Sequence, residues 1–141
     1  MTSGAVVAVV ILTAGVALAA PLSESQWKQQ GTAVCKQVNK DLDAIQKDVF
    51  AGLGKNEKPS ADQFDAFVAQ FVPVIEGAVA SIDALNEPKS LQSGVKKFDA
   101  AVADALATIE ADPEAAFSGD DPFAKANKVA KKIGLRACAG G

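Results

Sequence analysis

The chain has 141 residues, of which 49% are hydrophobic and 22% are charged, and its formal net charge is -3. This length suits one domain, and the high apolar fraction excludes a disordered chain. The sequence contains no histidine, which excludes mechanisms that need an imidazole base and most zinc sites. An acidic chain with a single arginine, Arg136, also lacks the basic stripe that a nucleic-acid-binding protein needs.

The N-terminal segment is apolar and uncharged. Residues 5–20 read AVVAVVILTAGVALAA, a run shorter than the ~20 residues that cross a bilayer comfortably. The run ends in Ala17-Leu18-Ala19, a pattern typical of signal-peptidase sites. We therefore predict a signal peptide over 1–19 and one secreted or envelope-associated domain over 20–141, which is not an integral membrane protein once the signal is removed. An uncleaved anchor and a buried core helix are the alternatives.

The first predicted helix covers about 23–53. Ser23, with Gln26 three residues later, is a capping-box pair. The apolar side chains that follow Trp27 are spaced for one face of a helix. They are Val34, Cys35, Val38, Leu42, Ile45, Val49 and Leu53.

The second predicted helix covers about 60–86 and repeats the capping box with Ser60 and Gln63. Pro73 lies inside its apolar pattern, where it removes one backbone donor and clashes with the preceding turn. We expect a kink at this point, and two shorter helices are the alternative.

Two further helices are predicted over about 90–110 and 122–133, separated by an acidic loop over 114–121. Asp121 is expected to cap the last helix, with Pro122 in its first turn. Gly134 suits the left-handed residue after a helix, and Leu135 suits the apolar residue that folds back on it. The whole pattern predicts an all-α protein, an antiparallel four-helix bundle with helices over about 23–53, 60–86, 90–110 and 122–133.

The sequence has two cysteines, Cys35 and Cys138. In an exported protein an even number of thiols is normally oxidised, so we predict a disulfide that fastens the C-terminal tail to the first helix. A catalytic redox pair would normally show the Cys-x-x-Cys spacing, which is absent, and a metal site would need more ligands.

Four sequence fragments stand out by their order along the chain. They are Leu22-Ser23-Glu24-Ser25-Gln26-Trp27, Phe71-Val72-Pro73-Val74-Ile75, Asp121-Pro122-Phe123-Ala124-Lys125-Ala126-Asn127 and Gly134-Leu135-Arg136-Ala137-Cys138. Together these fragments resemble a family of small exported helical proteins and lipoproteins of actinobacteria. The resemblance implies the fold, export and the Cys35–Cys138 pair, but it implies no activity. The lipid-attachment cysteine that many members of this family carry after the signal is missing.

Other side chains are weaker candidates for a site. Trp27 is expected to cover one end of the core, with contact to a partner as the alternative. Lys125, Lys128 and Lys132 share one helical face, which is either solvated or attracted to an anionic envelope component. The acids of the 114–121 loop do not match the ligand spacing of a calcium loop. The phenylalanines are expected to fill the core or, alternatively, to line a cavity.

We therefore expect a protein without enzymatic activity, metal or cofactor that binds a partner at the cell envelope or outside the cell. Its partner would be an envelope protein or an anionic envelope component. A carrier of an apolar ligand in the bundle core is one alternative. A small envelope enzyme is another, because the composition includes enough acids for a catalytic carboxylate pair.

Overall fold

The structure is a computed structural model that describes residues 20–140, so the predicted signal peptide lies outside the described residues. The described part is helical and contains no strand, which confirms the all-α class. Its elements are α1 (Glu24–Val49), α2 (Ala61–Asp83), α3 (Gln92–Ala111), α4 (Pro113–Ser118), α5 (Ala124–Ile133) and the 3-10 helix η1 (Arg136–Ala139).

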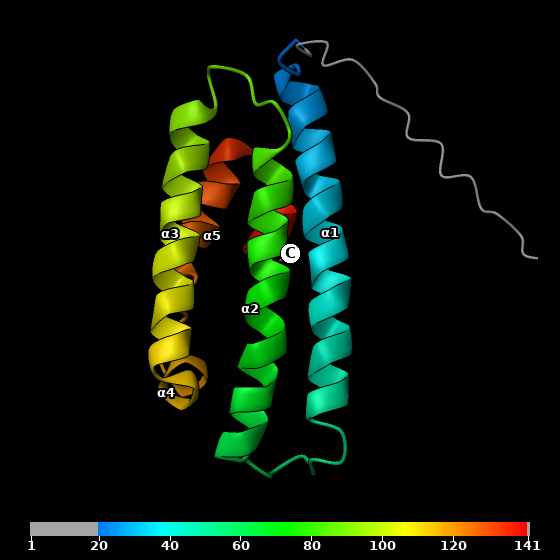
Figure 1. The fold of residues 1–141 in the computed structure, drawn as a ribbon, viewed down its shortest axis with the longest axis vertical. Coiled ribbons are helices and arrows are strands. Elements are labelled where there is room, and N and C mark those ends of the chain that lie inside the picture. Colours follow the sequence, from blue (N-terminus) through cyan, green and yellow to red (C-terminus); the bar gives the residue numbers. More distant parts are fainter. Residues whose placement is uncertain (1–19, 141) are drawn as a thin grey trace, which may run out of the picture.

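The helices pack as two pairs. Figure 1 shows α1 beside α2, and α5 packs against α3. The short helix α4 contacts both α2 and α3, and η1 lies between α5 and α1. The last residues of the chain therefore return to the first helix.

Both predicted capping boxes are confirmed. The Ser23 hydroxyl accepts a hydrogen bond from the Gln26 backbone, and the Gln26 side chain accepts one from the Ser23 backbone. Ser60 and Gln63 do the same at the start of α2. These bonds satisfy backbone donors that the first turn of a helix leaves free. Because they form between residues three apart, the starts of α1 and α2 could be predicted from the sequence.

The helix ends were predicted less well. α1 ends at Val49 rather than near residue 53, because the chain turns through Gly52, which has a left-handed φ of 87°. α2 ends at Asp83, and α3 is shifted slightly, to Gln92–Ala111. α2 continues through Pro73, so the alternative of two shorter helices is wrong.

The acidic segment before α5 is not simply a loop. Asp112 caps α4 by accepting a hydrogen bond from the Ala115 backbone at 3.0 Å, and Pro113 occupies the first turn. The prediction that Asp121 is the N-cap of a helix from 122 is also wrong. Asp121 accepts a 2.8 Å bond from the Phe123 backbone within a turn, and α5 begins at Ala124.

The end of α5 is as predicted. Gly134 is left-handed with a φ of 89°, and the Leu135 backbone donates to the Ala130 carbonyl at 2.8 Å. Leu135 is fully buried and lies over Gly31 of α1. A Cβ at Gly31 would lie 2.6 Å from a Leu135 methyl carbon, so glycine is needed for this close approach.

Burial along α1 is uneven. Trp27, Gly31 and Cys35 are buried, whereas the apolar residues of the second half of the helix are only half-buried. The core of the molecule lies around the middle of α3, where nearly every inward side chain is buried. Neighbouring helices therefore bury the apolar stripe of α1 as far as Cys35 and only partly bury the residues that follow it. The half-buried positions are Val38, Leu42, Ile45 and Val49.

Candidate functional site

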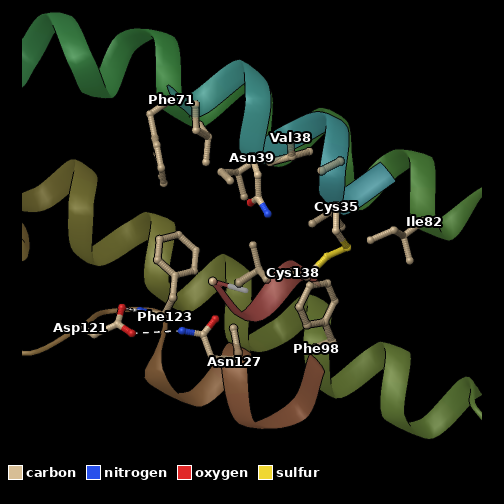
Figure 2. A pocket seen from close by; sticks show the side chains of 17 residues that line it. Cys35, Val38, Asn39, Phe71, Ile82, Phe98, Asp121, Phe123, Asn127 and Cys138 are labelled. Carbon is tan, nitrogen blue, oxygen red and sulfur yellow. Dashed lines mark hydrogen bonds between the residues drawn. A yellow bond between two sulfur atoms is a disulfide. The ribbon is translucent and has the colours of Figure 1, made fainter. Parts of the chain in front are cut away.

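A cavity of about 240 Å³ lies beside the part of α1 where the buried positions end and the half-buried ones begin. Figure 2 shows α1 and α2 on one side of it and α3 and α5 on the other. Its walls are mostly apolar. They include Val38 and Leu42 from α1, Phe71, Ile75 and Ile82 from α2, Phe98 from α3 and Phe123 before α5. We call this space the disulfide cavity.

The Cys35–Cys138 disulfide, predicted from the sequence, is present and forms one wall of this cavity (Figure 2). It joins residues 103 positions apart, with their Cα atoms 4.8 Å from each other. A disulfide is typical of proteins from oxidising compartments outside the cytosol. The Asn39 side chain adds a second link to the tail by donating a 3.0 Å hydrogen bond to the Ala137 carbonyl.

Polar side chains lie at the mouth of the disulfide cavity. Asn39, Asp121 and Gly140 line it and are exposed, so this side is open to solvent. The Asn127 amide donates a 3.1 Å bond to Asp121, and Figure 2 shows Asn127 facing Asn39 across the space. The side-chain oxygens of Asn39 and Asn127 accept no hydrogen bond from the described residues, which leaves them free for a ligand.

A second hollow adjoins the disulfide cavity at the far end of α1 and α2. We call it the aromatic groove; its walls include Phe50, Phe64, Phe67, Phe71 and Phe117. The Phe67 ring lies 5.4 Å from that of Phe50 and 5.2 Å from that of Phe117, in contacts typical of aromatic clusters. Phe117 on α4 is 42% exposed, the only large hydrophobic side chain so exposed in the part of the chain that the structure describes.

A separate acidic contact lies between α2 and α3. Burial, and after it the negative charge of Asp83, raises the pKa of Asp99 to about 6. The Oδ1 atom of Asp99 is buried and has no hydrogen-bond partner among the described residues. A hydrogen bond between Asp99 and Asp83 requires that one of the two carboxyls is protonated, which also favours the protonated form of Asp99. Glu87 adds a weaker repulsion.

This contact predicts a pH dependence of stability. A pKa raised above its ordinary value of about 3.9 means that the folded state binds the proton more tightly. The stabilisation is complete below about pH 4 and is lost as the pH rises through about 6. We expect Asp99→Asn to raise the midpoint of urea unfolding at pH 7.5. The midpoint of the wild type should rise when the pH is lowered from 7.5 to 5, and the variant should show a smaller rise. Asp65→Asn on exposed α2 surface is the control, and equal profiles for both variants would contradict this assignment.

The other residues singled out in the sequence lie apart from the cavity. Trp27 is fully buried, so it covers the core as expected and its side chain offers no surface to a partner. Lys125, Lys128 and Lys132 are exposed, and the Lys125 ammonium lies 3.2 Å from the Asp104 carboxylate.

Sequence reasoning treated the phenylalanines mainly as core, and it did not identify Asn39, Asp121 or Asn127 as a polar rim. The apolar stripe of α1 is compatible with full burial, so periodicity alone could not reveal the hollow. One indirect signal is present in the sequence. Asn39 and Asn127 each interrupt an apolar helix face, four positions after Cys35 and Phe123 respectively.

Within residues 20–140, no group of three or more acids or cysteines is placed to hold a metal ion. One described helix, α2, is long and apolar enough to cross a membrane by length and composition alone. Four of its side chains are nevertheless buried in the core of this fold, and the same test is passed by core helices of soluble proteins.

Comparison of the chain with protein-family models, with curated proteins and with solved structures found no match.

Proposed function

We propose that this protein is an exported, non-enzymatic helical protein that binds an apolar ligand in the disulfide cavity. The observation that carries the proposal is an open, apolar cavity of about 240 Å³ in the interior of a small domain. Apolar walls that stay in contact with water are unfavourable, and concave apolar pockets with a few polar groups are typical binding sites for small molecules. A space with such walls therefore suits an apolar ligand, which would cover them.

The size of the cavity supports a small ligand. An apolar cavity of about 150 Å³ can hold benzene, and pockets for drug-sized molecules begin near about 300 Å³. The disulfide cavity lies between these two sizes. Its polar groups are few and lie at the mouth, where they would orient one end of a ligand while the walls bury the rest.

The chemistry of the walls supports binding without catalysis. The polar side chains that line the cavity are Asn39, Asp121 and Asn127, and the Asp121 carboxylate already accepts bonds from Phe123 and Asn127. No serine, threonine or lysine lines the cavity within the described residues, so the walls offer no nucleophile with a base beside it.

We also propose that the domain is an antiparallel four-helix bundle formed by α1, α2, α3 and α5, and that it works outside the cytosol. The colours of Figure 1 run down α1, up α2 and down α3, which supports this topology. The disulfide and the apolar segment over 5–20 support export.

A neutral fluorescent probe tests the binding site. N-phenyl-1-naphthylamine becomes bright in apolar surroundings, and we expect the oxidised protein to bind it. Ala78 lines the cavity from α2, so Ala78→Phe would place a ring in the space and should weaken probe binding by at least about tenfold, equivalent to ~1.4 kcal/mol.

The matched control is Ala69→Phe, because Ala69 is an exposed residue of the same helix that lines neither hollow. It should bind the probe as the wild type does. Equal binding by the wild type and both variants would place the probe elsewhere and would contradict the proposed site.

A further inference from the structure

Building on the proposed function, we infer that the ligand is a linear amphiphile with a long alkyl chain and a neutral, hydrogen-bonding head group. The head group would lie between Asn39 and Asn127 at the mouth of the disulfide cavity. The chain would run past Leu42 and Phe71 into the aromatic groove. This inference names the ligand class and the direction in which it binds.

The first observation is that the two hollows are neighbours and share two wall residues. Leu42 of α1 and Phe71 of α2 line both the disulfide cavity and the aromatic groove. Leu42 is only half-buried although it belongs to the apolar stripe of α1. An apolar chain along this stripe would complete the burial that the helices leave unfinished.

The second observation is the length of the path. Asn39 and Phe50 are eleven positions apart, which corresponds to about 16 Å along a helix. A compact ligand that fits the disulfide cavity would leave the aromatic groove empty. A flexible linear chain can fill both hollows, because it is narrow and can pass from one to the other beside Leu42 and Phe71.

The third observation concerns the polar end. The Asn39 amide donates one N–H to the Ala137 carbonyl and the Asn127 amide donates one N–H to the Asp121 carboxylate, while the two amide oxygens accept no hydrogen bond from the described residues. Free oxygens on opposite sides of the mouth accept hydrogen bonds, so they match a head group that donates them. A hydroxyl group has this property.

Charge argues against an anionic head. The charged side chains that line the two hollows are Asp121 and Glu57, and both are acidic. Neither hollow is lined by a lysine or arginine within the described residues. A carboxylate or phosphate head would therefore lie near Asp121 without a counter-ion, which is unfavourable.

Chain length is the first test. Primary alcohols of about 8 to about 16 carbons, kept below their solubility limits, would compete with N-phenyl-1-naphthylamine on the disulfide-bonded protein. We expect affinity to rise by up to about fourfold per added CH2, which corresponds to ~0.8 kcal/mol per buried CH2, until the groove is full. An affinity that stops rising at the shortest chains would overturn the continuous path.

The groove itself is tested at Phe117, which lies at its wall and is more exposed than the other phenylalanines of the groove. Phe117→Ala should weaken the longest alcohols by several-fold and leave the shortest unchanged. Phe117→Leu, which keeps an apolar wall, should restore most of the loss. Equal losses at all chain lengths would place the chain outside the aromatic groove.

The head group is tested at one chain length with the alcohol, the carboxylate and the amine. We expect the alcohol to bind at least about tenfold more tightly than the carboxylate at pH 8, and Asn127→Leu to reduce this difference. Equal or tighter binding of either the carboxylate or the amine would overturn the neutral head. Binding of N-phenyl-1-naphthylamine distinguishes a wrong ligand class from a wrong binding site. If the wild type binds the probe and Ala78→Phe abolishes that binding, only the ligand class is wrong. If the wild type does not bind the probe, the proposed binding site is wrong too.

Discussion

Replacing both cysteines with alanine should lower the free energy of unfolding by about 2–5 kcal/mol. The disulfide joins residues 103 positions apart, and the chain-entropy model gives ~4.7 kcal/mol for a closed loop of about 100 residues. Alanine is the suitable replacement at Cys35, because this residue is 1% exposed and a serine hydroxyl there would be buried among apolar groups. Urea denaturation followed by far-UV circular dichroism measures the change.

Reduced wild-type protein is the control, since it removes the same bond while keeping both sulfur atoms. It should unfold at nearly the same urea concentration as the double variant. The helices should persist in the absence of denaturant, because the tail remains attached through buried Leu135 and the Asn39–Ala137 hydrogen bond. A urea midpoint unchanged by reduction would show that the bond contributes nothing to stability.

The same variant should also bind the probe more weakly. Cys35 and Cys138 line the cavity, and Gly140 lies at its mouth, so the disulfide holds the tail in place as one wall of the cavity. Binding that is unaffected by reduction would mean that the tail is not part of the site.

Substitution of Trp27 should give the second large effect. Trp27→Ala removes a fully buried indole and is expected to cost about 3–5 kcal/mol, because the surrounding side chains can only partly fill the space. Trp27→Phe should cost much less. The indole nitrogen of Trp27 is buried and donates no hydrogen bond to the described residues, so its loss removes an unsatisfied donor together with the apolar surface.

The informative quantity is the difference in unfolding free energy between the two variants. It should be followed by circular dichroism, because both variants remove the only tryptophan and with it the tryptophan fluorescence. A buried donor without a partner costs about 1–3 kcal/mol, and this relief should offset part of the packing lost in the phenylalanine variant. If phenylalanine proves as destabilising as alanine, the indole nitrogen has a partner such as a buried water.

Helix starts and the crosslink could be predicted from the sequence because both depend on local or pairwise chemistry. The bonds of the Ser23 and Ser60 capping boxes form between residues three apart, whatever the rest of the chain does. Gly134 and Leu135 likewise form a local motif that ends α5. With only two cysteines in the chain, one pairing was possible.

The start of α5 and the helix α4 were missed because two acids could each cap a helix. Asp112 caps α4, and Asp121 closes a turn two residues before α5. Sequence preference for aspartate does not distinguish a helix cap from a turn, since the side chain accepts a backbone hydrogen bond in both.

The sequence by itself determined the helical class, the capped starts of α1 and α2 and the covalent link between the first helix and the tail. Only the tertiary structure decided that the stripe of α1 is covered as far as Cys35 and left half-open from Val38 onwards. Periodicity records which face of a helix is apolar, but burial depends on how far the neighbouring helices extend along that face. The cavity and the aromatic groove arise from that difference.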